Sequence, residues 1–340
     1  MNRKDDHINE ALRQSPHAND FDGIRFVPDS LAKTDVKDVD CSTSFFGHTF
    51  SAPIYINAMT GGSETSLTIN SKLAEVAKAH GLMIASGSVS AAIKDPKWEP
   101  TFRIIRETYP DGCVAANIGL SQDLEGAKQA VAILDADVLQ IHLNAPQEIV
   151  MPEGDRDFSR WPRRLEDIVR HVGVPVIVKD VGFGMSRTTV SRLASRGVRH
   201  IDVSGRGGTN FIDIENARRD MRLDDFSGYG FSTPESLLDI HDRHDMTVFA
   251  SGGVRGAYDI VKSLYLGADM VGLSGFFLRL VSTHDVLEAI RRTGQLIGDV
   301  KGIMAVLNAK NIHELRKKEV IFSPSLKHFM KEREITFPRG

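Results

Sequence analysis

The sequence predicts an α/β chain folded as a (β/α)₈ TIM barrel with N-terminal and C-terminal extensions. From about residue 54, short apolar runs rich in β-branched residues alternate with longer segments of helical spacing. Apolar runs without polar alternation indicate strands buried on both faces, as in a parallel sheet covered by helices. Eight such units within 340 residues favour a closed barrel. An open doubly wound sheet is the alternative, because strand counts from a sequence can err by one.

The elements follow in order along the chain. The expected strands are residues 53–59, 82–86, 113–118, 137–143, 174–179, 200–204, 247–250 and 269–273. The expected helices are residues 66–80, 122–134, 163–172, 188–196, 234–244 and 257–266, with a weaker pattern at 98–109 and an eighth helix at 285–296. We expect three parts: an N-terminal segment crossing the barrel mouth (1–52), the barrel (53–300) and a C-terminal helical extension (301–340). No Pro/Gly/Ser linker divides them.

The charge balance argues against nucleic acid or an anionic membrane as a partner. The chain carries 42 basic and 45 acidic residues, a net charge of −3. No apolar run approaches the ~20 residues that span a bilayer, and the first seven residues are too polar for a signal peptide. Two cysteines, Cys41 and Cys113, cannot form a disulfide framework. We therefore expect a cytoplasmic protein that binds phosphate only through a local cluster.

Glycines follow several predicted strands at the end where barrel enzymes carry their active sites. The relevant segments are Gly205-Arg206-Gly207-Gly208-Thr209, Ser251-Gly252-Gly253-Val254 and Leu273-Ser274-Gly275. Glycine lets backbone N–H groups approach an anion, and the loops after strands seven and eight commonly hold a phosphate. The alternative is that these glycines only form tight turns.

Lys179 closes the fifth predicted strand and is expected to point its ammonium into the barrel mouth. There it would stabilise the negative charge of a reduced flavin ring. The alternative is an ion pair with a neighbouring carboxylate.

The fourth strand ends in a group of polar residues. His142 and Asn144 share one face of the strand, and Gln147 and Glu148 follow in its loop. Glu148 suits a Mg²⁺ ion, which uses one or two carboxylates together with substrate phosphates and water. At the N-terminus, Arg3 and Lys4 with His7 would supply cations to a diphosphate if this segment covers the mouth.

These residues together resemble the type 2 isopentenyl-diphosphate isomerase family, over nearly the whole chain. The matching segments are Arg3-Lys4 with His7, Asn57-Ala58-Met59-Thr60-Gly61-Gly62, Gln140-Ile141-His142-Leu143-Asn144 with Gln147-Glu148, Met151-Pro152-Glu153-Gly154-Asp155-Arg156, Val178-Lys179-Asp180-Val181-Gly182-Phe183-Gly184, Gly205-Arg206-Gly207-Gly208-Thr209-Asn210 and Ala250-Ser251-Gly252-Gly253.

The resemblance implies FMN, NADPH or NADH as its reductant, Mg²⁺, and interconversion of isopentenyl and dimethylallyl diphosphates. It implies a homotetramer or homo-octamer. The residues it assigns to FMN are Met59, Thr60, Gly61, Ser88, Asn117, Lys179, Thr209, Gly252, Gly253, Val254, Ser274 and Gly275. It assigns substrate to Arg3, Lys4, His142, Asn144 and Gln147, catalysis to Gln147 and His142, and the metal to Glu148.

One segment departs from the family. After the second strand the family commonly has Gly-Ser-Gln, often followed by Arg, whereas this chain has Gly87-Ser88-Val89-Ser90. The cation that some members place there is absent, so no substrate contact is expected from Val89 or Ser90.

Three other functions compete. A 2-hydroxy-acid oxidase or dehydrogenase that uses FMN would need a histidine base beside arginines on late loops, where the chain offers only Arg206 and Arg255. An inosinate-type dehydrogenase would need a cysteine nucleophile on a barrel loop. Cys113 begins the third predicted strand and Cys41 precedes the barrel, so neither is placed for this role. A flavin-storage protein would leave Gln147 and Glu148 unexplained.

Overall fold

Eight parallel strands close into a barrel in the computed structural model, which describes residues 3–14, 18–226, 228–242 and 245–337, with side chains from residue 7 onward. The order around the barrel is β10-β11-β4-β5-β6-β7-β8-β9. Chain neighbours are paired in space throughout, and β11 closes the ring on β4. The predicted barrel is confirmed, and the open sheet is wrong.

Each barrel strand overlaps a predicted apolar run, with its ends shifted by at most a few residues. The strands are β4 (Ile54–Ile56), β5 (Met83–Ser88), β6 (Val114–Gly119), β7 (Val138–Leu143), β8 (Val176–Asp180), β9 (His200–Asp202), β10 (Thr247–Ala250) and β11 (Met270–Leu273). Every residue of β6 is buried, as expected for a strand with the barrel interior on one face and helices on the other.

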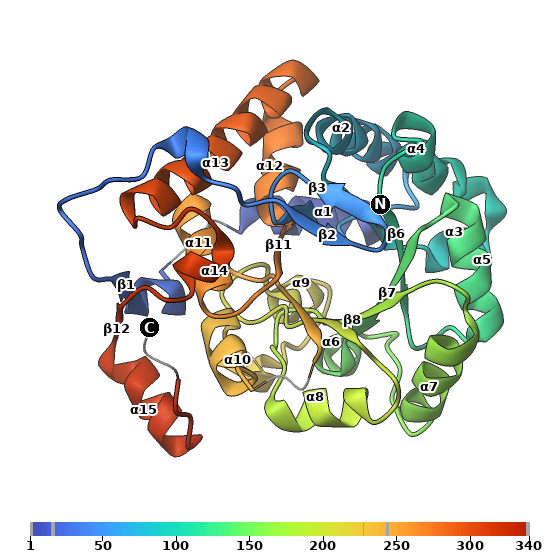
Figure 1. Cartoon of the computed structure of the whole chain (residues 1–340). Helices are drawn as coiled ribbons and strands as arrows, with labels where there is room; N and C mark the ends of the chain where they lie inside the picture. The colour runs from blue at the N-terminus through green and yellow to red at the C-terminus, as the bar shows by residue number, and fades with distance from the viewer. Residues whose placement is uncertain (1–2, 15–17, 227, 243–244, 338–340) are drawn as a thin grey trace.

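Helices surround the strands as an outer ring (Figure 1). They are α2 (Glu64–His80), α4 (Pro100–Thr108), α5 (Leu124–Leu134), α7 (Trp161–His171), α8 (Arg187–Ala194), α10 (Thr233–Asp239), α11 (Ala257–Tyr265) and α13 (Val286–Val306). Side-chain caps begin several of them: Ser63, for example, accepts from the N–H of Ser66 at the start of α2. None of the described helices is both long and apolar enough to cross a membrane.

Four further helices lie in the loops that follow barrel strands. They are α3 (Ser90–Lys94), α6 (Ala145–Val150), α9 (Phe211–Asn216) and α12 (Gly275–Thr283). The sequence predicted none of these four helices; α12, for example, begins at Gly275 directly after Ser274, which makes no side-chain cap. The expected eighth helix also extends ten residues further, to Val306, because Leu296, Val300 and Met304 continue its buried face at four-residue spacing.

The N-terminal segment contributes to both ends of the barrel. Helix α1 (Arg3–Arg13) lies at the end where the strands finish and lines a cavity there. The hairpin of β2 (Thr43–Phe45) and β3 (His48–Phe50) covers the opposite end, where Phe45 packs edge-on against Phe249 of β10. Its turn has positive φ at Phe46 (55°) and Gly47 (81°), the geometry that two-residue hairpin turns favour.

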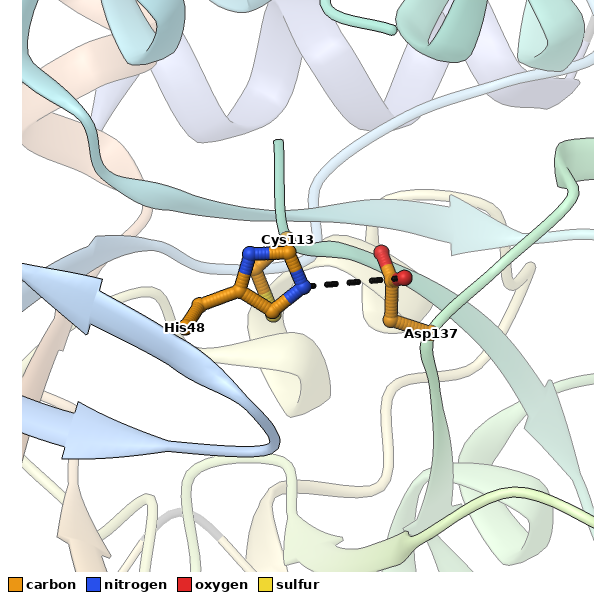
Figure 2. Close-up of side chains that lie close together, drawn as sticks. All are labelled: His48, Cys113 and Asp137. Atoms are coloured by element: carbon orange, nitrogen blue, oxygen red, sulfur yellow. Dashed lines mark ion pairs between the residues drawn. The ribbon is translucent and has the colours of Figure 1, made fainter. Parts of the chain in front are cut away.

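Only part of the N-terminal segment therefore lies at the predicted mouth. At the hairpin end, His48 faces Asp137 and Cys113 (Figure 2). Both residues directly precede barrel strands, so this end is the one at which the strands begin.

The C-terminal extension was predicted to be helical, but it also contains a strand. It contains α14 (Ile312–Leu315), β12 (Val320–Phe322) and α15 (Pro324–Glu332). Strand β12 pairs antiparallel with β1 (Ile24–Phe26), so that Arg25 lies opposite Ile321. Strand β12 forms by pairing with residues almost 300 positions away, so nothing in its local sequence marks it as a strand. The segment was therefore predicted as part of a helical extension. The predicted limit at residue 300 lies within α13, and the three-part division stays a prediction.

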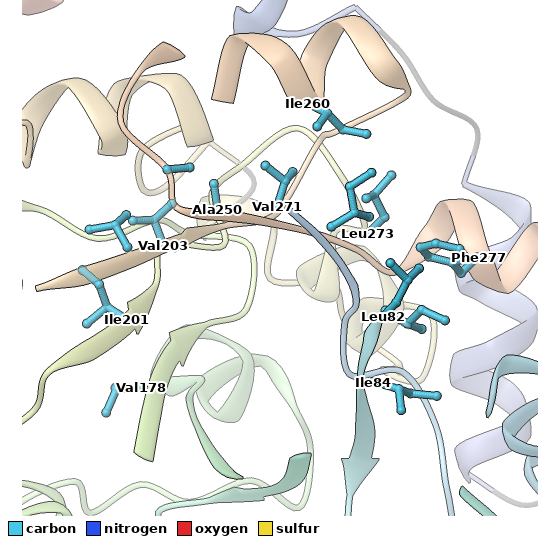
Figure 3. Close-up of a cluster of buried hydrophobic side chains, with 14 of the residues drawn as sticks. Leu82, Ile84, Val178, Ile201, Val203, Ala250, Ile260, Val271, Leu273 and Phe277 are labelled. Atoms are coloured by element: carbon cyan, nitrogen blue, oxygen red, sulfur yellow. The ribbon is translucent and has the colours of Figure 1, made fainter. Parts of the chain in front are cut away.

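The core has two layers. Between the strands and the helices lie Ile201, Val203, Val271, Leu273, Phe277 and their neighbours (Figure 3). Inside the barrel, Tyr55, Met83, Val138, Ile177, Phe249 and Met270 fill the hydrophobic interior. Gly272 is required beside this layer because a Cβ there would lie 2.5 Å from the Tyr55 ring. The interior is thus packed, and any ligand must bind above it.

Candidate active site

A cavity of about 940 Å³ opens at the carboxyl ends of the barrel strands. Loops after all eight strands reach it, together with His7, Ile8, Ala11 and Gln14 of the N-terminal segment. The volume lies at the upper end of the range for ligand and cofactor sites. The cavity therefore has room for a flavin nucleotide and a small substrate together.

A buried polar layer separates the cavity from the apolar interior. Asp202 of β9 is fully buried and accepts from Tyr55 Oη at 2.6 Å and from Asn57 Nδ2 at 2.9 Å. Ser251 Oγ donates to the same carboxylate at 2.8 Å. Burial and the nearby Asp202 charge hold the pKa of Tyr55 well above its ordinary value, so its hydroxyl stays a donor. This layer gives the cavity a rigid polar floor.

Two glycine-rich loops meet at one side of the cavity. Gly252 and Gly253 follow β10 with φ of 89° and 74°, which favours glycine. A Cβ on Gly252 would lie 2.1 Å from the carbonyl oxygen of Gly205, and one on Gly208 would lie 2.6 Å from the nitrogen of Gly253. Glycine is therefore required here for the loops after β9 and β10 to pack together. These glycines thus do more than form tight turns.

The start of α12 opens onto the same side. Ser274 and Gly275 line the cavity, and no side chain caps the helix at Ser274. The N–H groups of the first helical turn, with the positive end of the helix dipole, form a favourable site for a phosphate. Glycine loops and this helix end together fit the phosphate of FMN.

Thr60 and Lys179 offer polar groups where a flavin ring would lie. Thr60 Oγ1 is buried and has no hydrogen-bond partner among the described residues. Lys179 is 7% exposed and donates to the carbonyl oxygen of Asp180 at 2.6 Å. Burial lowers the pKa of Lys179, while Asp202 and Asp180 oppose that effect. Among the described residues the ammonium therefore bonds to a backbone carbonyl, while the carboxylates of Asp202 and Asp180 act on it through their charge.

The loop after β7 carries a connected network. Asn144 Nδ2 donates to Glu148 Oε1 at 2.8 Å and lies 3.3 Å from Gln147 Oε1. Gln147 Nε2 in turn donates to Glu215 Oε1 at 2.8 Å. Glu148 Oε2 accepts from the backbone N–H of Asp155 at 2.8 Å. Each carboxylate oxygen of Glu148 thus keeps a lone pair, with which it could bind a hard cation such as Mg²⁺.

Glu215 anchors this network from behind. Its side chain has no exposed surface, and it also contacts His7 Nε2 at 3.3 Å and Arg218 Nη1 at 2.7 Å. Burial raises the pKa of Glu215, but the contacts with His7, Gln147 and Arg218 outweigh it and lower the value to about 2. The carboxylate is therefore charged; it fixes the Gln147 amide and faces His7 of α1.

His142 of β7 is held by Asn117 of the neighbouring strand β6. Its Nδ1 lies 2.8 Å from Asn117 Oδ1, and Asn117 Nδ2 donates to Gln140 Oε1 at 3.2 Å. In the sheet, His142 lies opposite Lys179 of β8 and Gly119 of β6. The missing side chain of Gly119 makes room for the ring, because a Cβ there would lie 2.7 Å from Nε2.

Most of the predicted site residues line this one cavity. They are Met59, Thr60, Ser88, Asn117, Lys179, Thr209, Gly252, Gly253, Val254, Ser274 and Gly275, with His142, Asn144, Gln147 and Glu148. Gly61 does not line it: its backbone faces Phe102, 2.0 Å from where a Cβ would be. Arg3 and Lys4 begin α1, but their side chains lie outside the described residues.

Other residues at the site were not predicted. Trp98, Phe211 and Arg279 line the cavity, and Glu215 lies behind it. No sequence pattern marks Glu215, because an acid in a short helix beside Asp213 and Arg218 is typical of a solvated surface. The two late-loop arginines are already paired: Arg206 lies 3.4 Å from Glu235, and Arg255 contacts Asp22 and Asp259. This pairing disfavours their binding the carboxylate of a 2-hydroxy acid.

Known proteins resemble the chain at two levels. The FMN-dependent dehydrogenase family matches residues 8–99 and 118–322. A protein of Latilactobacillus sakei named isopentenyl-diphosphate delta-isomerase is 47% identical over 98% of this chain and 97% of its own length. Proteins of the same name from Staphylococcus saprophyticus and Staphylococcus aureus (strain JH9) are 46% and 44% identical over 97% and 99% of this chain.

The chain belongs to the isopentenyl-diphosphate delta-isomerase family. Membership confirms the predicted resemblance, the enzyme class and the dependence on FMN. Among solved structures, a flavocytochrome b2 variant with sulfite bound superimposes with a TM-score of 0.64 at 21% identity, covering 100% of this chain and 86% of its own. A mandelate oxidase variant with a monooxide FMN adduct gives 0.62 at 15%, covering 94% and 92%. These two likenesses show the shared barrel fold alone.

Proposed function

We propose that this member of the family interconverts isopentenyl and dimethylallyl diphosphates, using reduced FMN and Mg²⁺, with NADPH or NADH as the reductant. One observation carries the proposal: the network of Asn144, Gln147 and Glu148 faces the same cavity as buried Lys179 and the glycine loops. A flavin-storage protein would have no use for such a network. In this chain the charged carboxylate of Glu215 fixes Gln147, as a residue that positions a substrate requires.

The flavin phosphate would bind at Gly252, Gly253, Val254, Ser274 and Gly275. Backbone N–H groups there and the open end of α12 supply donors without a side chain in the way. Met59, Thr60, Ser88, Asn117, Lys179 and Thr209 would surround the ring system. Gly61 would serve by allowing this loop to pack against Phe102.

The diphosphate would bind beside α1 and the loop after β7. Glu148 would hold Mg²⁺, which needs few protein ligands when substrate phosphates and water complete its octahedron. Asn144, already bonded to Glu148, would contact the same group. Arg3 and Lys4 would add cations from the first turn of α1, as the family resemblance implies.

The reaction moves a double bond by adding one proton and removing another, with no net electron transfer. Reduced FMN, when bound, would supply an acid–base group beside the substrate. Gln147 would orient the substrate or relay a proton, because Glu215 fixes its Nε2 and leaves Oε1 toward Asn144. Lys179 would stabilise the anionic reduced ring, and His142 is the alternative proton donor at the strand end.

The remaining expectations concern the setting of the enzyme. Cys41 and Cys113 are both free and buried, which supports a cytoplasmic location for the protein. Assembly as a homotetramer or homo-octamer rests on the family resemblance.

The proposal is tested by mixing purified protein with isopentenyl diphosphate, Mg²⁺ and either oxidised or dithionite-reduced FMN, and following dimethylallyl diphosphate by NMR. We expect turnover only with reduced FMN, with many product molecules formed for each reductant molecule consumed. Reduced 5-deaza-FMN should not support turnover. Oxygen consumption with 2-hydroxy acids and no isomerisation would favour the oxidase alternative. Full activity with oxidised FMN or with the deaza analogue would move the acid–base roles to His142 and Glu148.

A further inference from the structure

At the end of the barrel opposite the cavity, three metal-ligating side chains converge (Figure 2). They are His48 on β3, Cys113 just before β6 and Asp137 just before β7. One ligand atom from each lies within 4.8 Å of the other two. None of these residues takes part in the proposed isomerase chemistry.

We propose that His48, Cys113 and Asp137 form a zinc site that ties the N-terminal hairpin to the barrel. One thiolate, one imidazole and one carboxylate form a ligand set typical of Zn²⁺, a borderline-soft ion. Ligand atoms of a tetrahedral zinc site lie about 3.3–3.6 Å apart, given Zn–N and Zn–S bonds of about 2.0–2.3 Å. The 3.7 Å between His48 Nε2 and Asp137 Oδ1 is close to that spacing, and the Cys113 ligand atom lies within 4.8 Å of both.

The facing atoms of His48 and Asp137 leave a gap that an ion would fill. His48 Nε2 lies 3.7 Å from Asp137 Oδ1, which is too long for a hydrogen bond. The other carboxylate oxygen, Oδ2, is taken by Arg106 Nη2 at 2.7 Å and by the N–H of Val114 at 2.9 Å. Asp137 is thus held in place through Oδ2, and Oδ1 is turned toward the imidazole.

Arg106 does not compete for the ion. Its remaining N–H groups donate to the carbonyl oxygens of Pro110, Gly112 and Asp135 at 2.6–3.0 Å. The thiolate and the carboxylate supply two negative charges to the ion, and Arg106 shares the charge of Asp137 through Oδ2. The side chains of His48 and Asp137 are 28% and 31% exposed, so an ion would reach the site from their side, while Cys113, 1% exposed, closes it from within the barrel.

Zinc binding would change the state of the cysteine. Burial, with a contribution from Asp137, raises the pKa of the Cys113 thiol to about 12, so the thiol is protonated in the metal-free protein. Binding would form the Zn–S bond and release this proton to solvent. The site would be structural, because it lies where the strands begin and barrel active sites lie where they end.

The test is titration of the purified FMN-bound enzyme with Zn²⁺ by calorimetry, followed by zinc K-edge X-ray absorption of the complex. We expect one tight ion per chain, one sulfur scatterer at about 2.3 Å and nitrogen or oxygen scatterers at about 2.0 Å. Titrations in two buffers of different ionisation enthalpy should show release of one proton. Cys113→Ser and His48→Gln should each weaken binding at least about tenfold and remove the sulfur or one nitrogen signal.

Cys41→Ser is the matched control, since Cys41 is also buried and free but belongs to no such cluster of ligating side chains among the described residues, and the affinity of this variant for zinc should equal that of the parent. His48→Gln changes a partly exposed hairpin residue, so it keeps the test valid if Cys113→Ser does not fold. A spectrum without sulfur, or unchanged affinity in either variant, would overturn the proposal and leave His48 and Asp137 as an ordinary ion pair.

Discussion

Replacement of Glu215 by glutamine should destabilise the protein, mainly because Arg218 and His7 lose the charged carboxylate that they face. Glu215→Gln keeps the side-chain shape and an oxygen that can accept from Gln147, but it removes the charge that faces His7 and Arg218. The fall of the Glu215 pKa from 4.5 to about 2, at about 1.36 kcal/mol per pH unit, corresponds to roughly 3 kcal/mol of stability. Breaking a buried ion pair by removing one partner costs a similar amount.

The stability that Glu215 contributes depends on pH in a defined direction. Because its folded pKa is below its unfolded pKa, the contribution is complete above about pH 4.5 and is lost as the pH falls toward 2. The cost of Glu215→Gln should therefore be near 3 kcal/mol at pH 7 and should shrink toward zero at acidic pH. Since Glu215 also holds His7, amide hydrogens of α1 should exchange faster in the variant.

Urea unfolding at several pH values measures these differences, and Glu153→Gln is the matched control. Glu153 pairs with the same Arg218 but is 44% exposed, so its replacement should cost no more than about 1 kcal/mol. Equal costs for the two variants, or a Glu215→Gln cost that does not change with pH, would refute the reasoning.

Three further predictions concern the proposed roles. Glu148→Gln should retain FMN but raise the Mg²⁺ concentration needed for half-maximal activity at least about tenfold, whereas Asp155→Asn should not; an unchanged Mg²⁺ response would remove Glu148 from the metal site. Lys179→Ala should lower the FMN midpoint potential by about 30–60 mV, whereas exposed Lys94→Ala at the rim should leave it unchanged; no shift in the Lys179 variant would exclude a cation effect on the ring. Deletion of residues 1–7 should raise the KM for the diphosphate and leave the FMN spectrum unaltered, and an unaffected KM would count against a substrate role for Arg3 and Lys4.

The barrel strands were predictable because the local chemistry determines them. A strand buried on both faces must be apolar throughout, so each run in the chain marked its own position, and β10 (Thr247–Ala250) was predicted to the residue. Helix α12 and strand β12 were not predictable in this way. The first begins without a cap, and the second forms only by pairing with β1 near the other end of the chain.

The site shows the same division. Which residues follow each strand is a property of the sequence, and the closure of the barrel brings them together, so Lys179, Gln147 and Gly252 could be placed at one cavity in advance. The sequence by itself also determined the fold and the family resemblance. Only the tertiary structure decided that Gly61 packs on Phe102, that Glu215 fixes Gln147, and that His48 meets Asp137 across the far end. These contacts join segments from about 40 to 90 positions apart, and their geometry depends on packing that no local periodicity records.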